Sequence, residues 1–166
     1  MRLTFKLIML LLLPATLFAQ STAVLKKQAT IVSDALVSGD YSTVVNYMYP
    51  KIVQNAGGKQ KMLQLLTGAM MQMKATGATF QSATIGEPGK FYKAGREIHC
   101  LVPENIRVKT ANGSFATQSN LLAVSQNGGK SWTFTDLNKA TIDKIPQLFP
   151  YFNKDLRLPQ PKTPSL

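Results

Sequence analysis

The stretch Arg96-Glu97-Ile98-His99-Cys100-Leu101-Val102 decides how this sequence is interpreted. It holds the only histidine and the only cysteine of the 166-residue chain, and one of its eight acidic residues. Apolar side chains at every second position predict a strand, and we expect this strand to be central in a sheet. We therefore expect any chemistry of the protein to pass through this stretch.

Alternate residues of a strand point to opposite faces of its sheet. Ile98, Cys100 and Val102 share one face, which we expect to join the core. Cys100 has no second cysteine to pair with, and its apolar neighbours predict a buried thiol. Glu97 and His99 share the other face, which we expect to border either solvent or a concave cavity.

Glu97 and His99 are the candidate catalytic residues. A carboxylate beside an imidazole raises the pKa of the imidazole and orients the ring, which suits a general base. The alternative is an exposed glutamate–histidine pair without a function, as many strands carry.

The first 19 residues are typical of a secretory signal peptide. Arg2 and Lys6 precede an apolar run, Leu7 to Leu13, and cleavage is expected after Ala19. The run is shorter than the about 20 residues that span a bilayer, so we expect no stable membrane insertion after cleavage. The ending at residues 17–20 resembles signal peptides of Gram-negative, Bacteroidetes-type bacteria. We expect an exported protein, either periplasmic or secreted.

The chain is strongly basic, with a net charge of +11. Loss of residues 1–19, which contain two basic residues and no acidic one, leaves +9. The charges are scattered, and Lys26-Lys27 is the only adjacent basic pair, so we do not expect nucleic acid as a partner. The charge favours an anionic envelope component or an acidic small ligand. The alternative is a basic surface that serves solubility alone.

Three helical segments are expected before any strand. Residues 22–38 show helical spacing and end at Gly39, and Asp40 can cap a second helix that stops or bends at Pro50. A short helical continuation at residues 51–53 can follow. The third helix, residues 59–75, carries an apolar stripe of Met62, Leu65, Leu66, Ala69, Met70 and Met73.

From residue 78 the pattern changes to that of strands. Strands are expected at residues 79–85, 91–103 with a bend at 94–95, 106–110, 115–125 and 130–135, with a break at Pro103 to Asn105. Asn112-Gly113 and Asn127-Gly128 predict hairpin turns. A short helix at residues 139–145 and an extended tail at 156–166 complete the chain.

Helices followed by strands predict an α+β fold. We expect a single domain at residues 20–155, with three N-terminal helices packed on one strongly bent antiparallel sheet of about four strands and a short C-terminal helix.

A ligand pocket is the second candidate site. Tyr41, Tyr47 and Tyr49 cluster near the second helix and could rim such a pocket, and Met70 and Met73 could line it with malleable side chains. The alternative is ordinary packing, with the tyrosine hydroxyls in water.

One turn resembles the Asp-box hairpin, Ser-x-Asp-x-Gly-x-Thr-Trp. Here the turn reads Ser125-Gln-Asn-Gly-Gly-Lys-Ser-Trp132, with Asn127 in place of the aspartate. Asparagine can make the same bonds from its side chain to the backbone. The resemblance implies the geometry of the hairpin and no catalytic role.

Cofactor and metal motifs are absent from the sequence. One histidine and one cysteine without a carboxylate cluster make no metal-ligand set. No glycine-rich loop lies between a strand and a helix, so no nucleotide motif is present. We expect no cofactor.

The order of elements, with Gly-Asp-Tyr at 39–41 and Gly-Gly-Lys at 57–59, resembles the nuclear transport factor 2-like, or cystatin-like, superfamily. The resemblance implies a cone-like fold with a pocket between sheet and helices, and a homodimer built on the open face of the sheet. Members of that superfamily are isomerases, dehydratases or cyclases, or non-catalytic binding domains. No catalytic motif of such enzymes matches here. Our leading hypothesis is an exported, non-catalytic binding or accessory domain for a small, anionic ligand. The alternative is a small lyase or isomerase that uses Glu97 and His99.

Overall fold

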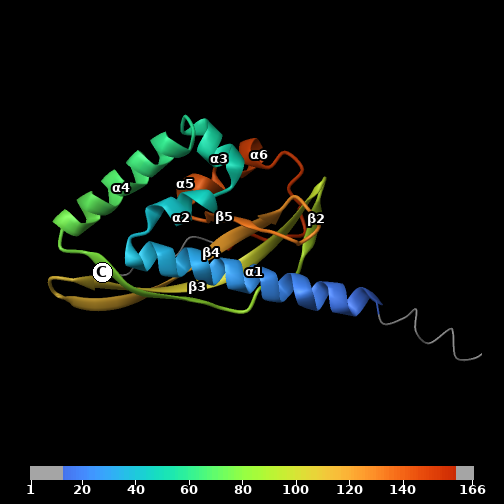
Figure 1. The fold of residues 1–166 in the computed structure, drawn as a ribbon, viewed down its shortest axis with the longest axis horizontal. Coiled ribbons are helices and arrows are strands. Elements are labelled where there is room, and N and C mark those ends of the chain that lie inside the picture. The colour runs from blue at the N-terminus through green and yellow to red at the C-terminus, as the bar shows by residue number, and fades with distance from the viewer. Residues whose placement is uncertain (1–12, 160–166) are drawn as a thin grey trace, which may run out of the picture.

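The computed structural model describes residues 13–159 and confirms the α+β class (Figure 1). Four helices precede the sheet: α1 (Leu13–Ser38), α2 (Tyr41–Asn46), α3 (Pro50–Asn55) and α4 (Lys59–Ala75). Gly39, with φ of 82°, ends α1, and the Asp40 carboxylate caps α2 by accepting from the Thr43 amide at 3.1 Å. Pro50 begins α3, so the segment that we expected as one helix with a short continuation forms two helices.

The five strands form one open antiparallel sheet in the order β1-β3-β4-β5, with β2 also paired to β3. They are β1 (Thr79–Ile85), β2 (Tyr92–Ala94), β3 (Glu97–Thr110), β4 (Gly113–Ser125) and β5 (Thr133–Asp136). The strand expected at residues 91–103 is divided at Gly95, where φ is 64°, and its second part continues through the segment expected at residues 106–110. The opening stretch lies at the start of β3, in the centre of the sheet as predicted.

The expected break at Pro103 to Asn105 is wrong, because β3 is continuous from Glu97 to Thr110. The Pro103 carbonyl accepts from the Gly86 amide at 2.8 Å. The chain between β1 and β2 therefore uses the carbonyl of residue 103 and does not need its N–H group. A proline, which lacks the N–H, fits there without loss of a ladder bond.

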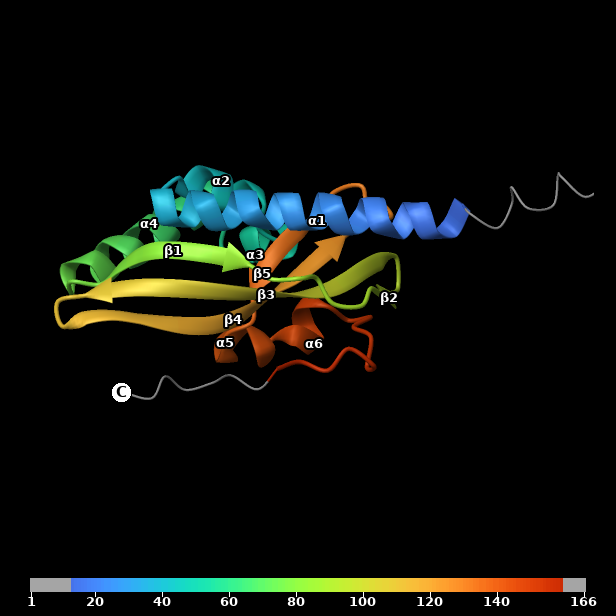
Figure 2. The same cartoon turned by 90° about the horizontal axis from the view of Figure 1, so that it is seen from below.

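Near the start of β3 both faces of the sheet are covered, and Figure 2 shows α1 on one side and the C-terminal segment on the other. From Pro103 to Lys109 every second residue of β3 is exposed, so the face opposite α1 is open there. On the α1 side, Cys100 and Val102 are fully buried against Leu25 and Ala29. Ile98 is half-buried against the same cluster. The prediction that these alternate residues of β3 face the core is therefore confirmed. Burial raises the pKa of the Cys100 thiol to about 12, so this thiol is unreactive at neutral pH.

A second core cluster covers the opposite face of β3 and β4. Its buried residues are Tyr49, Leu122, Val124, Leu137, Ile145, Leu148, Phe149 and Leu156. They come from the residue before α3, from the sheet, from Leu137 just before α5 (Lys139–Ile142), from α6 (Ile145–Leu148) and from the chain beyond α6. Ile142 of α5 packs against the cluster and is partly buried. Because Leu156 is 3% exposed, packing continues past the boundary that we expected at residue 155.

The chain before α3 reaches this second cluster by running beside β5. The Tyr49 amide donates to the Phe134 carbonyl at 3.0 Å, and the Phe134 amide donates to the Tyr47 carbonyl at 2.7 Å. Met48 forms a parallel bridge with Phe134. The pairing turns Tyr49 into the second cluster, while Tyr47 packs against the first.

The turn before β5 has the side-chain bonds expected of an Asp-box-like hairpin. Asn127 Oδ1 accepts from the Ser131 amide at 2.9 Å, and its Nδ2 donates to Ser131 Oγ at 2.8 Å. Trp132 is 2% exposed beneath the turn. The asparagine therefore performs the structural task of the aspartate.

Candidate functional site

Glu97 is the first residue of β3 and follows the turn that comes after β2. The turn at Gly95 joins β2 to β3, and a side chain at that position would meet Cβ of Tyr151 at 3.0 Å. Glycine therefore both supplies the positive φ and lets Tyr151 lie against the turn. Arg96 and Glu97 follow at once, so their placement depends on this contact between distant parts of the chain.

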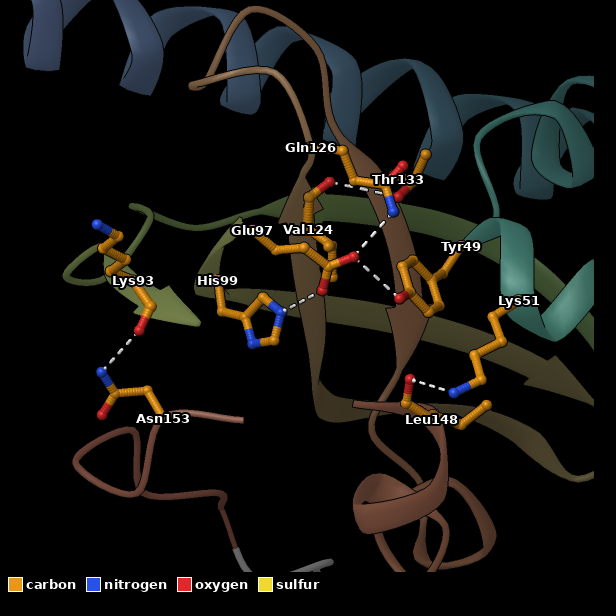
Figure 3. Close-up of polar contacts among 10 residues, drawn as sticks. All are labelled: Tyr49, Lys51, Lys93, Glu97, His99, Val124, Gln126, Thr133, Leu148 and Asn153. Carbon is orange, nitrogen blue, oxygen red and sulfur yellow. Dashed lines mark hydrogen bonds and ion pairs between the residues drawn. The ribbon is translucent and has the colours of Figure 1, made fainter. Parts of the chain in front are cut away.

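The Glu97 carboxylate accepts hydrogen bonds from three side chains (Figure 3). Its Oε1 accepts from the Tyr49 hydroxyl at 3.0 Å and from Gln126 Nε2 at 2.8 Å. Its Oε2 lies 3.0 Å from His99 Nε2. Burial alone would raise the pKa of Glu97, but the bonds from Gln126, His99 and Tyr49 outweigh it and lower the pKa. Glu97 is thus held as a carboxylate.

His99 is fully buried, and it does not face open solvent. Its ring contacts Phe149 edge-on, with centroids 5.2 Å apart, and Phe152 at 5.5 Å. Because the Glu97 carboxylate can only accept, His99 Nε2 carries the shared proton. Nδ1 is buried and has no hydrogen-bond partner among the described residues. Such an unsatisfied buried atom costs about 1–3 kcal/mol.

A strap of residues 147–153 covers His99 and is tied at both ends (Figure 3). At one end, Lys51 Nζ donates to the carbonyls of Gln147 at 2.6 Å and Leu148 at 3.2 Å. At the other end, Asn153 Nδ2 donates to the Lys93 carbonyl at 2.9 Å. These ties hold Phe149 and Phe152 against the imidazole.

A cavity of about 690 Å³ opens beside the Glu97 cluster. It is lined by Tyr49, Lys51, Ala94, Gly95, Arg96, Glu97, His99, Gln126, Phe149, Pro150 and Tyr151. The volume lies in the range of small-molecule sites. Tyr151 is 75% exposed at this cavity, and Arg96 is exposed without a hydrogen bond or ion pair to the described residues. The lining thus combines an aromatic surface with one uncommitted cation.

Of the predicted pocket residues, Tyr49 lines this cavity, whereas Tyr41, Tyr47, Met70 and Met73 do not. Tyr41, Met70 and Met73 line a separate cavity of about 260 Å³ between the end of α1, α4 and β1. Tyr47 lies apart from both cavities, packed against the first core cluster with its ring 6.5 Å from that of Phe134. The structure therefore divides the candidate residues between the two faces of the sheet.

Several features of the larger cavity were not predicted from the sequence. Tyr49 was predicted as one of three tyrosines at the rim of a pocket, but its bond to Glu97, which joins positions 48 residues apart, was not. Gln126 lies in the Asp-box-like turn, at a position the motif leaves free. Neither Arg96 nor Tyr151 belongs to a sequence motif. They come together only because Gly95, next to Arg96, packs against Tyr151 in the folded chain.

A second buried carboxylate lies further along β3, on the α1 side of the sheet. Glu104 is 4% exposed and accepts from the hydroxyls of Ser33, at 2.5 Å, and Ser119, at 3.3 Å. Burial raises the pKa of Glu104. The two hydroxyl bonds work against that rise, and the nearby Asp136 adds to it. Glu104 and its partners Ser33, Ser119 and Asp136 do not line the larger cavity.

Within residues 13–159, no three histidine, cysteine or acidic side chains come together as a metal site would require. No helix in this range is both long enough and apolar enough to span a bilayer. No protein-family model and no curated protein matches the sequence. The site must therefore be interpreted from its own geometry.

Proposed function

We propose that the protein is a non-catalytic binding domain whose cavity beside Glu97 takes a small anionic ligand with an aromatic part. One observation carries this proposal. The carboxylate in the cavity wall already accepts three hydrogen bonds from neighbouring side chains, whereas the Arg96 guanidinium is uncommitted among the described residues. A carboxylate or phosphate is the natural partner of a guanidinium.

The aromatic part of the ligand follows from the rest of the lining. Tyr151 exposes most of its ring at the cavity, and Phe149 lies in the wall beside it. An offset-stacked or edge-on ring gains about 0.5–1.5 kcal/mol from such neighbours beyond the area it buries. Lys51 adds positive charge to the same wall. A ligand with a planar ring and one acidic group therefore matches the cavity.

The proton-transfer groups of the site argue against catalysis. A general base works best when its pKa lies near the ambient pH. The pKa of Glu97 is lowered, and burial together with the Glu97 bond raises the pKa of the Tyr49 hydroxyl. Neither group is suited to exchange protons at neutral pH, which supports a binding role.

The second candidate function is a small lyase or isomerase that uses His99 with Glu97. The observation that favours it is the 3.0 Å contact between the two side chains on the cavity wall, with His99 Nδ1 free of any partner among the described residues. Turnover of a small carbonyl compound by the purified protein, lost in His99→Ala with the fold intact, would establish this function and refute the non-catalytic one.

Export and the nuclear transport factor 2-like relationship are parts of the same proposal. The charged start and apolar run of residues 1–19 support a signal peptide and a periplasmic or secreted location. The order of helices before a bent antiparallel sheet supports the cone-like superfamily, in which a homodimer through the open sheet face is common. The basic charge supports an anionic envelope component as an alternative source of the ligand.

Ligand binding is tested with benzoate and phenyl phosphate, and with benzyl alcohol as the uncharged comparison. Backbone NMR of the purified protein should show shifts at Arg96, Gln126 and Tyr151 for the two anions and none for the alcohol. Arg96→Gln should weaken anion binding about ten-fold, which equals about 1.4 kcal/mol.

Arg107→Gln is the matched control, because Arg107 is an exposed arginine of β3 that does not line the cavity. It should leave binding unchanged. The proposed site is wrong if neither anion shifts the NMR signals of the cavity residues, or if both arginine variants lose binding equally.

A further inference from the structure

Half of β4 forms an open edge of the sheet. β4 pairs with β3 along its whole length, but β5 pairs only with Leu121 to Val124. Residues 113–120 therefore have β3 on one side and no strand of the described chain on the other. In Figure 1 this half of β4 extends with β3 well beyond β5.

The register shows which backbone groups this edge presents. Thr110 and Gly113 close the two-residue turn, so they form a hydrogen-bonded pair, and such pairs alternate along an antiparallel ladder. The backbone groups of Ser114, Ala116, Gln118 and Asn120 then point away from β3. Asn120 confirms this alternation, because its carbonyl points away from β3 and accepts from the Leu137 amide at 2.9 Å. Ser114, Ala116 and Gln118 have the same orientation at the open edge.

Residues 113–120 lack the charges, prolines and β-bulges that usually prevent strand addition. Their sequence, Gly-Ser-Phe-Ala-Thr-Gln-Ser-Asn at 113–120, contains no charge and no proline. The β3–β4 register has no shift along this stretch. Phe115 is 47% exposed. β1, at the opposite end of the sheet, differs in having a register shift between Phe80 and Ser82.

We propose that this edge binds a second copy of the chain through antiparallel pairing of β4 with β4, centred on Ala116. In this register the outward groups of Ser114 meet those of the partner subunit's Gln118, and Ala116 meets its own copy. About six backbone hydrogen bonds form, two for each such pair. Phe115 lies opposite the partner subunit's Thr117, an aromatic and β-branched pair that stabilises sheets. The match is self-complementary, as a two-fold contact requires.

The positive charge of the chain does not oppose this contact. The nearest basic residues along the edge are Arg107 and Lys109 on β3, one strand behind β4. In the order β3-β4-β4-β3, equivalent charges lie about 14 Å apart, three strand spacings. This distance exceeds the Debye length of about 8 Å at physiological ionic strength, so their repulsion is largely screened. An isologous contact of this kind closes at the dimer.

Sedimentation velocity over a concentration series of the purified chain tests the proposal, with a monomer–dimer equilibrium expected. Ala116→Pro removes an outward N–H without removing a bond to β3, and should weaken dimerisation at least ten-fold. Ala116→Val keeps the N–H and should dimerise as the wild type does. Circular dichroism checks that both variants fold.

Cross-linking tests the register independently. Hydrogen-bonded antiparallel partners have Cα atoms about 5.5 Å apart, which suits a disulfide. Ala116→Cys should therefore form a disulfide-linked dimer under mild oxidation, while Gln118→Cys should not link to its own copy. Cys100 is fully buried and does not compete.

Three results would overturn the proposal: a monomer at every concentration, a dimer that resists Ala116→Pro, or cross-linking at residue 118 in place of 116. The second result would favour a dimer through the open face of the sheet.

Discussion

Glu97 and Glu104 lie on the same strand, yet their surroundings move their pKa values in opposite directions. Glu97 faces the C-terminal segment and accepts from Tyr49, Gln126 and His99. Glu104 faces α1 and accepts only from two hydroxyls, with Asp136 nearby. Burial by itself favours a higher pKa at both positions, but at Glu97 the hydrogen bonds outweigh it. The difference teaches that the number and kind of donors decide in which direction the pKa of a buried carboxyl moves.

The comparison has a functional side. The Glu97 region borders a cavity of about 690 Å³ and contains a histidine nitrogen without a partner among the described residues. The Glu104 region is closed by α1, and both of its oxygens accept hydroxyl bonds. We infer that Glu104 serves packing, whereas the Glu97 region keeps polar groups available for a ligand.

The largest effect is expected for Glu97→Ala. The substitution removes the acceptor of three donors, two of which belong to the buried residues Tyr49 and His99, and should lower the free energy of unfolding by about 3 kcal/mol at pH 7. Urea unfolding measures this loss. Glu87→Ala is the control, because the Glu87 side chain is 79% exposed and its ion pair with Lys26 is a surface one, worth about 0–1 kcal/mol.

The same loss should depend on pH. A lowered pKa means that Glu97 stabilises the fold fully above its unfolded pKa of about 4.3, and that this stabilisation is lost as the pH falls through the folded pKa. The wild type and Glu97→Gln should therefore converge in strong acid. A difference that grows as the pH falls would contradict the ionised state of Glu97.

Glu104→Gln should raise the free energy of unfolding at pH 7, by less than Glu97→Ala lowers it. Because burial raises the pKa of Glu104, the stability tied to its neutral form is present below pH about 4.3 and lost as the pH rises through the folded pKa. The amide keeps an acceptor for Ser33 and carries no charge. The variant should gain about 1 kcal/mol at pH 7 and nothing at pH 3, by urea unfolding at both values. A loss at pH 7 would show that the charge itself is needed.

The smallest effects come from removing a single hydroxyl from each region. Tyr49→Phe should cost about 1 kcal/mol, because the lost 3.0 Å bond goes to a charged acceptor. Ser119→Ala should cost less than about 0.5 kcal/mol, because its bond is 3.3 Å long. NMR titration adds a second test, since Tyr49→Phe should raise the pKa of Glu97 while Ser119→Ala leaves it unchanged. Equal costs would remove the distinction between the two regions.

Much of the fold could be predicted from local signals. The first strand, residues 79–85, and the third N-terminal helix, residues 59–75, were predicted with the bounds that the structure shows. Both hairpin turns have glycines at positive φ, at Gly113 and Gly128, as the Asn-Gly pairs indicated. The break expected at Pro103 was wrong because the neighbouring chain needs only the carbonyl there.

The candidate site could be predicted only in part. Glu97 and His99 were recognised because both project from one face of a strand, and they do lie 3.0 Å apart. The cavity beside them is assembled from residues near positions 50, 95, 126 and 150, which no sequence period connects. Met70 and Met73 were named from an apolar stripe on a helix, but such spacing does not reveal which face of a sheet the helix will cover.

The stacking of Trp132 gives the molecule a built-in optical reporter. Its ring lies 5.4 Å from that of Phe91, and its amide donates to Gln28 Oε1 on α1 at 2.8 Å. It is the only tryptophan of the chain, so intrinsic fluorescence excited at the indole band comes from one known place. Its emission should move to longer wavelength when α1 leaves the sheet and water enters. Stopped-flow refolding can thus time the docking of the first helix without any label.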